Sequence, residues 1–215
     1  MTSPAHDDQP TAQPDPRESL ALLEAERSRT ARALEPDVRL VYGVWGVAWL
    51  VGFLALWSSA TGTGPLVLPG PVAGGVFGGL LLLAVVVTGV HISRRVSGVV
   101  GTTSTQGAMY GWAWLLGFGG VGALTASVAM AGASPEVLGV LSPALSGLVV
   151  GLLYLAGGTL WQDRAQYSLG VWILGTSAAG ALAGYPTNYL VMGLLGGGGF
   201  LVAALVVALH HRTPR

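Results

Sequence analysis

Long apolar segments alternate with short polar or Gly/Pro-rich breaks along most of the chain, from about residue 38 to residue 210. Each apolar segment is close to the ~20 residues that a helix needs to cross a bilayer. None of them carries the charged outer face that a helix of a soluble core would show. The pattern therefore predicts an all-α polytopic membrane protein with six transmembrane helices. The predicted spans are about Val38–Ser58, Pro71–His91, Ala108–Met130, Glu136–Leu160, Tyr167–Gly184 and Asn188–His210.

A polar region precedes the first span. Residues 1–14 are rich in Pro, Asp and Gln, and we expect them to be disordered. Asp15 followed by Pro16 is a helix-start signal, so residues 15–36 are predicted to form an amphipathic cytoplasmic helix. Its thin apolar face and its arginines fit either a helix on the membrane surface or a solvated lead-in. The six-helix domain then occupies residues 37–210, and a cytoplasmic tail covers residues 211–215.

The basic residues alternate between loops, and all ten of them are arginines. They precede the first predicted span and recur in the second loop, the fourth loop and the tail. The loops at about 59–70, 131–135 and 185–187 contain neither Arg nor Lys. Because cytoplasmic loops carry an excess of basic residues, the pattern places both termini in the cytoplasm. We expect a multi-pass protein of the plasma membrane.

A short phrase recurs in the first, third and fifth predicted spans. Trp49 to Phe53 returns as Trp114 to Phe118 and, more faintly, as Trp172 to Gly175. A Trp three residues before a Gly lies on the same helix face. Because the phrase recurs in every second span, the chain is predicted to contain three helical-hairpin repeats. Transporters built from parallel repeats bind solutes at the repeat interface. Alternatively, the match arises by chance, because membrane helices concentrate Trp and Tyr at the interfaces and Gly-rich sequences match one another easily. The candidate translocation path comprises Trp49, Gly52, Trp114, Gly117, Tyr154, Trp172 and Gly175.

Glycine makes up 34 of the 215 residues, about twice its usual share. Pairs spaced four apart, such as Gly74 with Gly78 and Gly147 with Gly151, favour close helix packing. The last span contains a run of four glycines, which weakens a helix. This run either packs against a neighbouring helix or forms a hinge. The candidate hinge comprises Gly196, Gly197, Gly198 and Gly199.

Charged residues are only 9% of the chain, against roughly 25% in soluble proteins, and almost none lies in mid-span. Cysteine is absent, and no phosphate-loop motif or metal-ligand cluster occurs. We therefore expect no enzyme activity, no cofactor, no metal and no nucleic-acid partner. The remaining polar groups form a candidate cytoplasmic vestibule, or else anchor the helices at the interface. They are His91, Arg94, Arg95, Gln162, Asp163 and Arg164.

Three phrases carry a resemblance: residues 42–49 (YGVWGVAW), residues 107–112 (GAMYGW) and residues 161–164 (WQDR). In these the chain resembles uncharacterised six-span integral membrane proteins of actinobacteria, which are often labelled loosely as transporters. The resemblance covers about residues 18–210. It implies a transporter without a defined substrate, and it assigns no residue a role.

Two functions fit the sequence. The first is a small transporter or permease subunit for a neutral or weakly polar solute. The alternative is a non-transporting scaffold or regulatory subunit that acts through its Gly-rich helix faces. The expected partners are the lipid bilayer and either a second copy of the chain or another membrane subunit. A path through the protein requires Trp114 and Gly117 to face away from lipid.

Overall fold

The computed structural model describes residues 37–64, 66–96 and 102–210, together with a few positions between Asp15 and Ala25. Residues 1–36 and 37–215 form two separate units. In the first unit, the Asp15 carboxylate accepts a 3.0 Å hydrogen bond from the backbone N–H of Arg17, as expected at a helix start. The predicted disordered region, most of the predicted amphipathic helix and the tail lie outside the described residues.

Every regular element of the second unit, over its described residues, is a helix. The helices match the predicted spans to within a few residues, and α3 and α4 extend furthest beyond the prediction. The last predicted span consists of three consecutive pieces, of which the middle one, η1, is a π-helix. The elements are α2 (Val38–Thr61), α3 (Gly70–Val96), α4 (Thr102–Met130), α5 (Pro135–Leu160), α6 (Arg164–Ala183), α7 (Thr187–Val191), η1 (Met192–Gly197) and α8 (Gly198–His210).

Five helical segments of the described chain are long and apolar enough to cross a membrane, which indicates an integral membrane protein. They are Val38–Thr61, Gly70–Arg94, Thr105–Met130, Pro135–Leu160 and Thr187–Leu209. Helix α6 has 20 residues but is not among the five. It is less apolar because it carries Gln166, Ser168, Thr176 and Ser177. Five of the six predicted spans thus correspond to helices that are long and apolar enough to cross a membrane, and six crossings stay a prediction.

Local sequence signals set the helix ends. Asp37 caps α2, where its carboxylate accepts a hydrogen bond from the Arg39 N–H. The same helix ends at Gly62, whose φ of +66° is the left-handed conformation that glycine adopts without a steric penalty. Ser134 caps α5, and Pro135 occupies its first turn, where a missing N–H costs nothing.

The first and last of these helices, α2 and the η1–α8 segment, pack with their backbones in near contact. A Cβ added at Gly197 would lie 2.6 Å from the Leu50 nitrogen and 2.9 Å from the Gly46 carbonyl oxygen. Helices α5 and α6 pack in the same way, since a Cβ at Gly158 would lie 2.6 Å from the Tyr167 nitrogen. Small residues allow this approach in membrane helices. Glycine at these positions therefore allows the helices of the bundle to pack closely.

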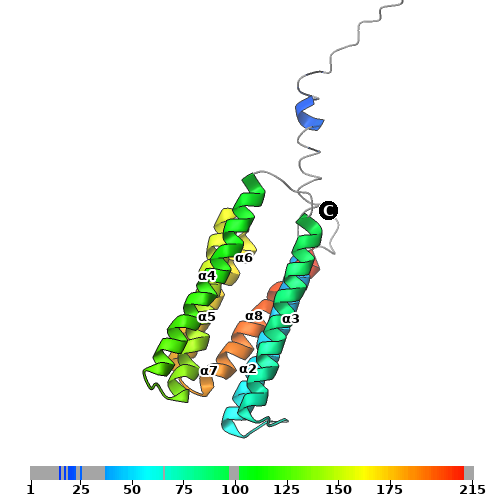
Figure 1. Cartoon of the computed structure of the whole chain (residues 1–215). Coiled ribbons are helices and arrows are strands. Elements are labelled where there is room, and N and C mark those ends of the chain that lie inside the picture. Colours follow the sequence, from blue (N-terminus) through cyan, green and yellow to red (C-terminus); the bar gives the residue numbers. More distant parts are fainter. Residues whose placement is uncertain are drawn as a thin grey trace, which may run out of the picture. The chain divides into compact units, whose positions relative to one another are not determined.

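Aromatic side chains fill the space among the central helices. Tyr42 and Trp49 of α2 contact Phe200 of α8, with ring centroids 6.2 and 5.5 Å apart. Tyr154 of α5 contacts the same phenyl ring at 5.7 Å. All four side chains are at least 90% buried. This cluster joins the two sides of the bundle that Figure 1 shows, α2 with α8 and α5 with α6.

Helices α3 and α4 lie at the periphery. Helix α3 packs mainly against α2, and α4 packs mainly against α5 (Figure 1). Each is tied to its neighbour by a polar contact: the Trp45 indole N–H donates to Thr88 at 3.1 Å, and the Tyr110 hydroxyl donates to the Leu153 carbonyl at 2.7 Å. Most other side chains on both helices are exposed.

The three copies of the Trp–Gly phrase differ in their surroundings. Gly52 lies against Phe77 of α3, and Gly117 lies against Val149 of α5. In these two copies the glycine faces the next helix along the chain. A Cβ at Gly175, by contrast, would meet no atom within 4 Å. Two copies thus share one packing relation, and the threefold repeat stays a prediction.

Candidate functional site

The predicted translocation path divides into an inner and an outer group. Trp49 and Tyr154 are buried in the aromatic cluster, and half-buried Trp114 contacts Tyr154 with a centroid distance of 6.0 Å. Trp114 and Gly117 therefore face α5. Since Gly52 also lies against a neighbouring ring, packed side chains occupy the space around the inner group.

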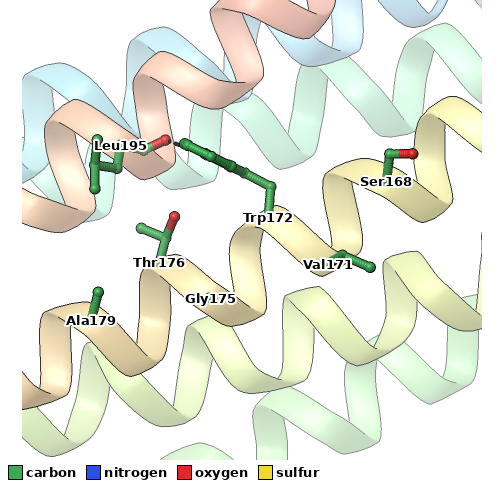
Figure 2. A pocket seen from close by; sticks show the side chains of 7 residues that line it. All are labelled: Ser168, Val171, Trp172, Gly175, Thr176, Ala179 and Leu195. Carbon is green, nitrogen blue, oxygen red and sulfur yellow. Dashed lines mark hydrogen bonds between the residues drawn. The ribbon is translucent and has the colours of Figure 1, made fainter.

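The outer group, Trp172 and Gly175, lines a groove of about 390 Å³ on the surface between α6 and η1. Figure 2 shows the Trp172 ring reaching from α6 towards Leu195 of η1. The lining is apolar apart from the hydroxyl groups of Ser168 and Thr176. The groove is lined by Ser168, Val171, Trp172, Gly175, Thr176, Ala179 and Leu195.

Two contacts hold the Trp172 ring in place although the side chain is 49% exposed. Its indole N–H donates to the Leu195 carbonyl oxygen at 2.8 Å. The ring also lies directly over Gly199, where any Cβ would collide with it. Both contacts lie at the nitrogen-bearing edge of the indole, which holds the ring as a wall of the groove.

Three of the four glycines in the candidate hinge lie against a neighbouring segment, which explains why a side chain is absent there. A Cβ at Gly196 would lie 2.8 Å from the Trp49 ring, Gly197 lies against the α2 backbone, and Gly199 lies beneath Trp172. Only Gly198 has open space around it. The first two also belong to the π-helical turn η1. π-turns are rare and are often found at functional sites.

Sequence reasoning missed a set of buried polar side chains. Asn188 is 1% exposed, and its amide donates to the Gly139 carbonyl at 2.7 Å. Its Oδ1 atom and the hydroxyl of buried Ser177 have no hydrogen-bond partner in the described structure. Polar residues in an apolar span are the signal that would have found them, because such groups are costly in hydrocarbon unless they are paired.

The contacts of the residues in the predicted cytoplasmic vestibule fall at two helix ends of the described structure. His91 accepts a hydrogen bond from the Asp37 N–H at 2.9 Å, so it holds the start of α2 against the end of α3. Asp163 caps α6 through the N–H groups of Ala165 and Gln166, at 2.8 and 3.1 Å.

The remaining vestibule residues follow this division. Gln162 donates to the Thr159 carbonyl at 2.9 Å, and Arg164 is exposed on α6. Arg94 is exposed near the end of α3, while the side chain of Arg95 lies outside the described residues. The described contacts of these residues thus lie at the α2–α3 end and at the α5–α6 turn, and the vestibule stays a prediction.

At the start of α2, an ion pair with Arg39 shifts the pKa of Asp37. The Arg39 guanidinium hydrogen-bonds the Asp37 carboxylate at 2.8 Å. This bond lowers the pKa of Asp37 from 3.8 to about 2, against a smaller opposing effect of burial.

Over residues 37–210, where described, no group of three or more His, Cys, Asp or Glu side chains lies close enough to hold a metal ion. The described surface instead offers an apolar groove and two peripheral helices with exposed faces. Comparison of the chain with protein-family models, curated proteins and solved structures finds no match.

Proposed function

We propose that this protein is a subunit of a membrane assembly and binds a partner helix through the outer faces of α3 and α4. The packing of these two helices carries the proposal. Each makes extensive contact with a single helix, which leaves its other faces without a neighbour among the residues that the structure describes. This is the scaffold or regulatory-subunit alternative of the sequence analysis.

The exposed faces are rich in glycines that no other part of the described chain uses. A Cβ added at any of them would meet no atom within 4 Å. On α3 they are Gly74, Gly75, Gly78 and Gly79, and on α4 they are Gly111, Gly119, Gly120 and Gly122.

Lipid contact alone does not account for these glycines. Each glycine costs a helix about 1 kcal/mol relative to alanine. Lipid-facing positions gain nothing from the missing side chain, whereas helix–helix interfaces in membranes gain a close backbone approach. The spacing of Gly74 and Gly78, and of Gly75 and Gly79, provides such an approach along one face of α3.

Blocking these faces tests the proposal. We expect Gly78→Leu and Gly120→Leu to abolish or strongly reduce a complex seen by native mass spectrometry after gentle extraction from the membrane. Ala178→Leu, on the exposed side of α6, adds the same kind of bulk elsewhere and should leave the complex intact. The measured mass distinguishes a second copy from another subunit. A complex that survives both glycine substitutions contradicts the proposal.

Transport of a neutral or weakly polar solute is the second candidate, and the π-turn η1 favours it. Irregular helices in membranes line cavities or solute sites in transporters. The buried rings of Trp49, Tyr154 and Phe200 would have to move to open a path. Reconstituted vesicles should then admit a panel of neutral solutes faster than protein-free vesicles. Equal entry rates for every solute would remove this candidate.

The proposed topology has six crossings with both ends in the cytoplasm of the plasma membrane. Close packing of α6 along α5, through pairs such as Gly151 with Gly170, supports α6 as the additional span. The chain contains no cysteine, so single introduced thiols can be labelled cleanly. A membrane-impermeant maleimide should label Thr63→Cys in intact cells, but Gln162→Cys only after permeabilisation. Labelling of both in intact cells would refute the topology.

A further inference from the structure

The groove beside Trp172 runs along one line of α6. Ser168, Gly175 and Ala179 are spaced by seven and four residues, which places them on one helix face. Gly175 lines the groove and has open space above it, because a Cβ there would meet no atom within 4 Å. The Trp172 ring and Leu195 form the wall on the η1 side (Figure 2).

The length of the groove matches one leaflet of a bilayer. Eleven residues separate Ser168 from Ala179, which is roughly 16 Å along a helix axis. Half of the ~30 Å hydrocarbon core is about 15 Å. One acyl chain therefore has the chemistry and the length to fill the groove.

A positive charge lies at one end of this line. Arg164 precedes Ser168 by four residues, which places it one turn further on the same face. It is exposed, and it is the only charged residue of α6. Neighbouring Asp163 is engaged with the N–H groups of Ala165 and Gln166 at the helix start.

We propose that this groove binds one anionic phospholipid, with an acyl chain along Gly175 and Trp172 and the headgroup phosphate at Arg164. An arginine at the interface attracts anionic headgroups, and the apolar groove holds the chain. The fixed Trp172 ring provides a preformed wall, so little ordering is needed on binding. The site is on α6 and is independent of the association proposed for α3 and α4.

A second groove provides an internal comparison. It has a similar volume of about 390 Å³ and lies between α2 and α3, with Gly43 and Arg39 in its lining. The difference is at its charged end, because the Arg39 guanidinium is bound to the Asp37 carboxylate at 2.8 Å. Selectivity for anionic lipid is therefore expected of the α6 groove alone.

The test uses the full chain in nanodiscs of dioleoyl-phosphatidylcholine and dioleoyl-phosphatidylglycerol. Native mass spectrometry after transfer to detergent counts the lipids that remain bound. We expect one retained phosphatidylglycerol, preferred over phosphatidylcholine by about fivefold. Gly175→Leu should fill the groove and lower retention of both lipids by about fivefold or more. Arg164→Gln should keep the bound lipid but lose the preference.

The matched control is Gly43→Leu, which fills the other groove and should leave the preference for phosphatidylglycerol unchanged. Unfolding temperatures confirm that the variants are folded, and Gly175 has the space to accept the change. Phosphatidylglycerol retention unchanged in Gly175→Leu, or a preference lost in Gly43→Leu, would overturn the proposal. So would a preference that persists in Arg164→Gln. None of these outcomes depends on whether Gly78→Leu disrupts a complex.

Discussion

Helices α2 and α8 use glycine in the opposite way from α3 and α4. At the centre, most glycines of α2, η1 and α8 lie beneath atoms of a neighbouring helix, as Gly46 lies beneath Leu201, and Gly43 and Gly198 are the exceptions. At the periphery, glycines such as Gly78 and Gly120 face open space. The same residue therefore allows close packing in one region and leaves an unused surface in the other. The number of glycines in a helix therefore does not locate an interface within the chain. The atoms that lie next to each glycine do locate it.

The largest expected effect tests the centre. Gly197→Ala should lower the free energy of unfolding by about 1–3 kcal/mol, because the new Cβ meets backbone atoms that cannot rotate away. Its neighbour is the control: Gly198→Ala has free space and should raise stability by up to about 1 kcal/mol. Thermal unfolding in detergent measures both. Equal shifts in the two variants would contradict the close approach of α2.

A smaller effect is expected for the buried polar groups. Asn188→Ala leaves the Gly139 carbonyl without its donor and should cost about 1–2 kcal/mol. The contrasting variant is Thr125→Val in peripheral α4, where the buried hydroxyl has no partner in the described structure. Its removal should be neutral or slightly stabilising. If both substitutions destabilise equally when unfolding is measured in detergent, the Asn188 bond is not the cause.

The periphery gives an effect of opposite sign. Gly120→Ala should stabilise the isolated chain by about 0.5–1 kcal/mol, because alanine is the better helix former and the site is open. The same substitution should weaken the complex if the α4 face binds a partner. Unfolding in detergent measures the stability of the isolated chain, and native mass spectrometry measures how much of the complex remains. A destabilised isolated chain would mean that the face is already in use.

The smallest effect concerns the start of α2. Asp37→Asn keeps a capping side chain but loses the ion pair, at a cost of about 0.5 kcal/mol. The pKa of Asp37 is lowered to about 2 in the folded protein, from 3.8. The stabilisation is therefore complete above about pH 5 and disappears as the pH falls towards 2. Unfolding temperatures of the two proteins should converge over that range, and a constant difference would contradict this account.

The apolar pattern predicted where the helices lie, but not which of them meet. The predicted spans Val38–Ser58 and Glu136–Leu160 lie within three residues of the observed bounds of α2 and α5 at each end. Neighbour choice is harder because lipid and protein interior are both apolar, so inward and outward faces have the same composition. Nothing in the sequence pairs Gly46 with Gly197, although both lie in Gly-rich segments.

The repeated phrase illustrates the same limit in the candidate site. Trp49 and Trp172 occupy matching positions, yet one is buried and the other forms the wall of an outer groove. The difference comes from the helix opposite each ring, which local sequence does not record. The buried amide of Asn188 was overlooked because it lies at a predicted span boundary, where polar residues are ordinary.

The pairing of α2 with η1 and α8 also has a consequence for biosynthesis. The two partners in this contact, Gly46 and Gly197, are separated by roughly 150 residues, which a ribosome adds in about 8–30 s. Throughout that interval α2 lacks the helix that covers its glycine and tryptophan face. A chaperone, the insertion machinery or lipid must occupy that face until synthesis is nearly complete. A chain truncated before residue 192 would keep it uncovered, which makes the last helix the step that completes assembly.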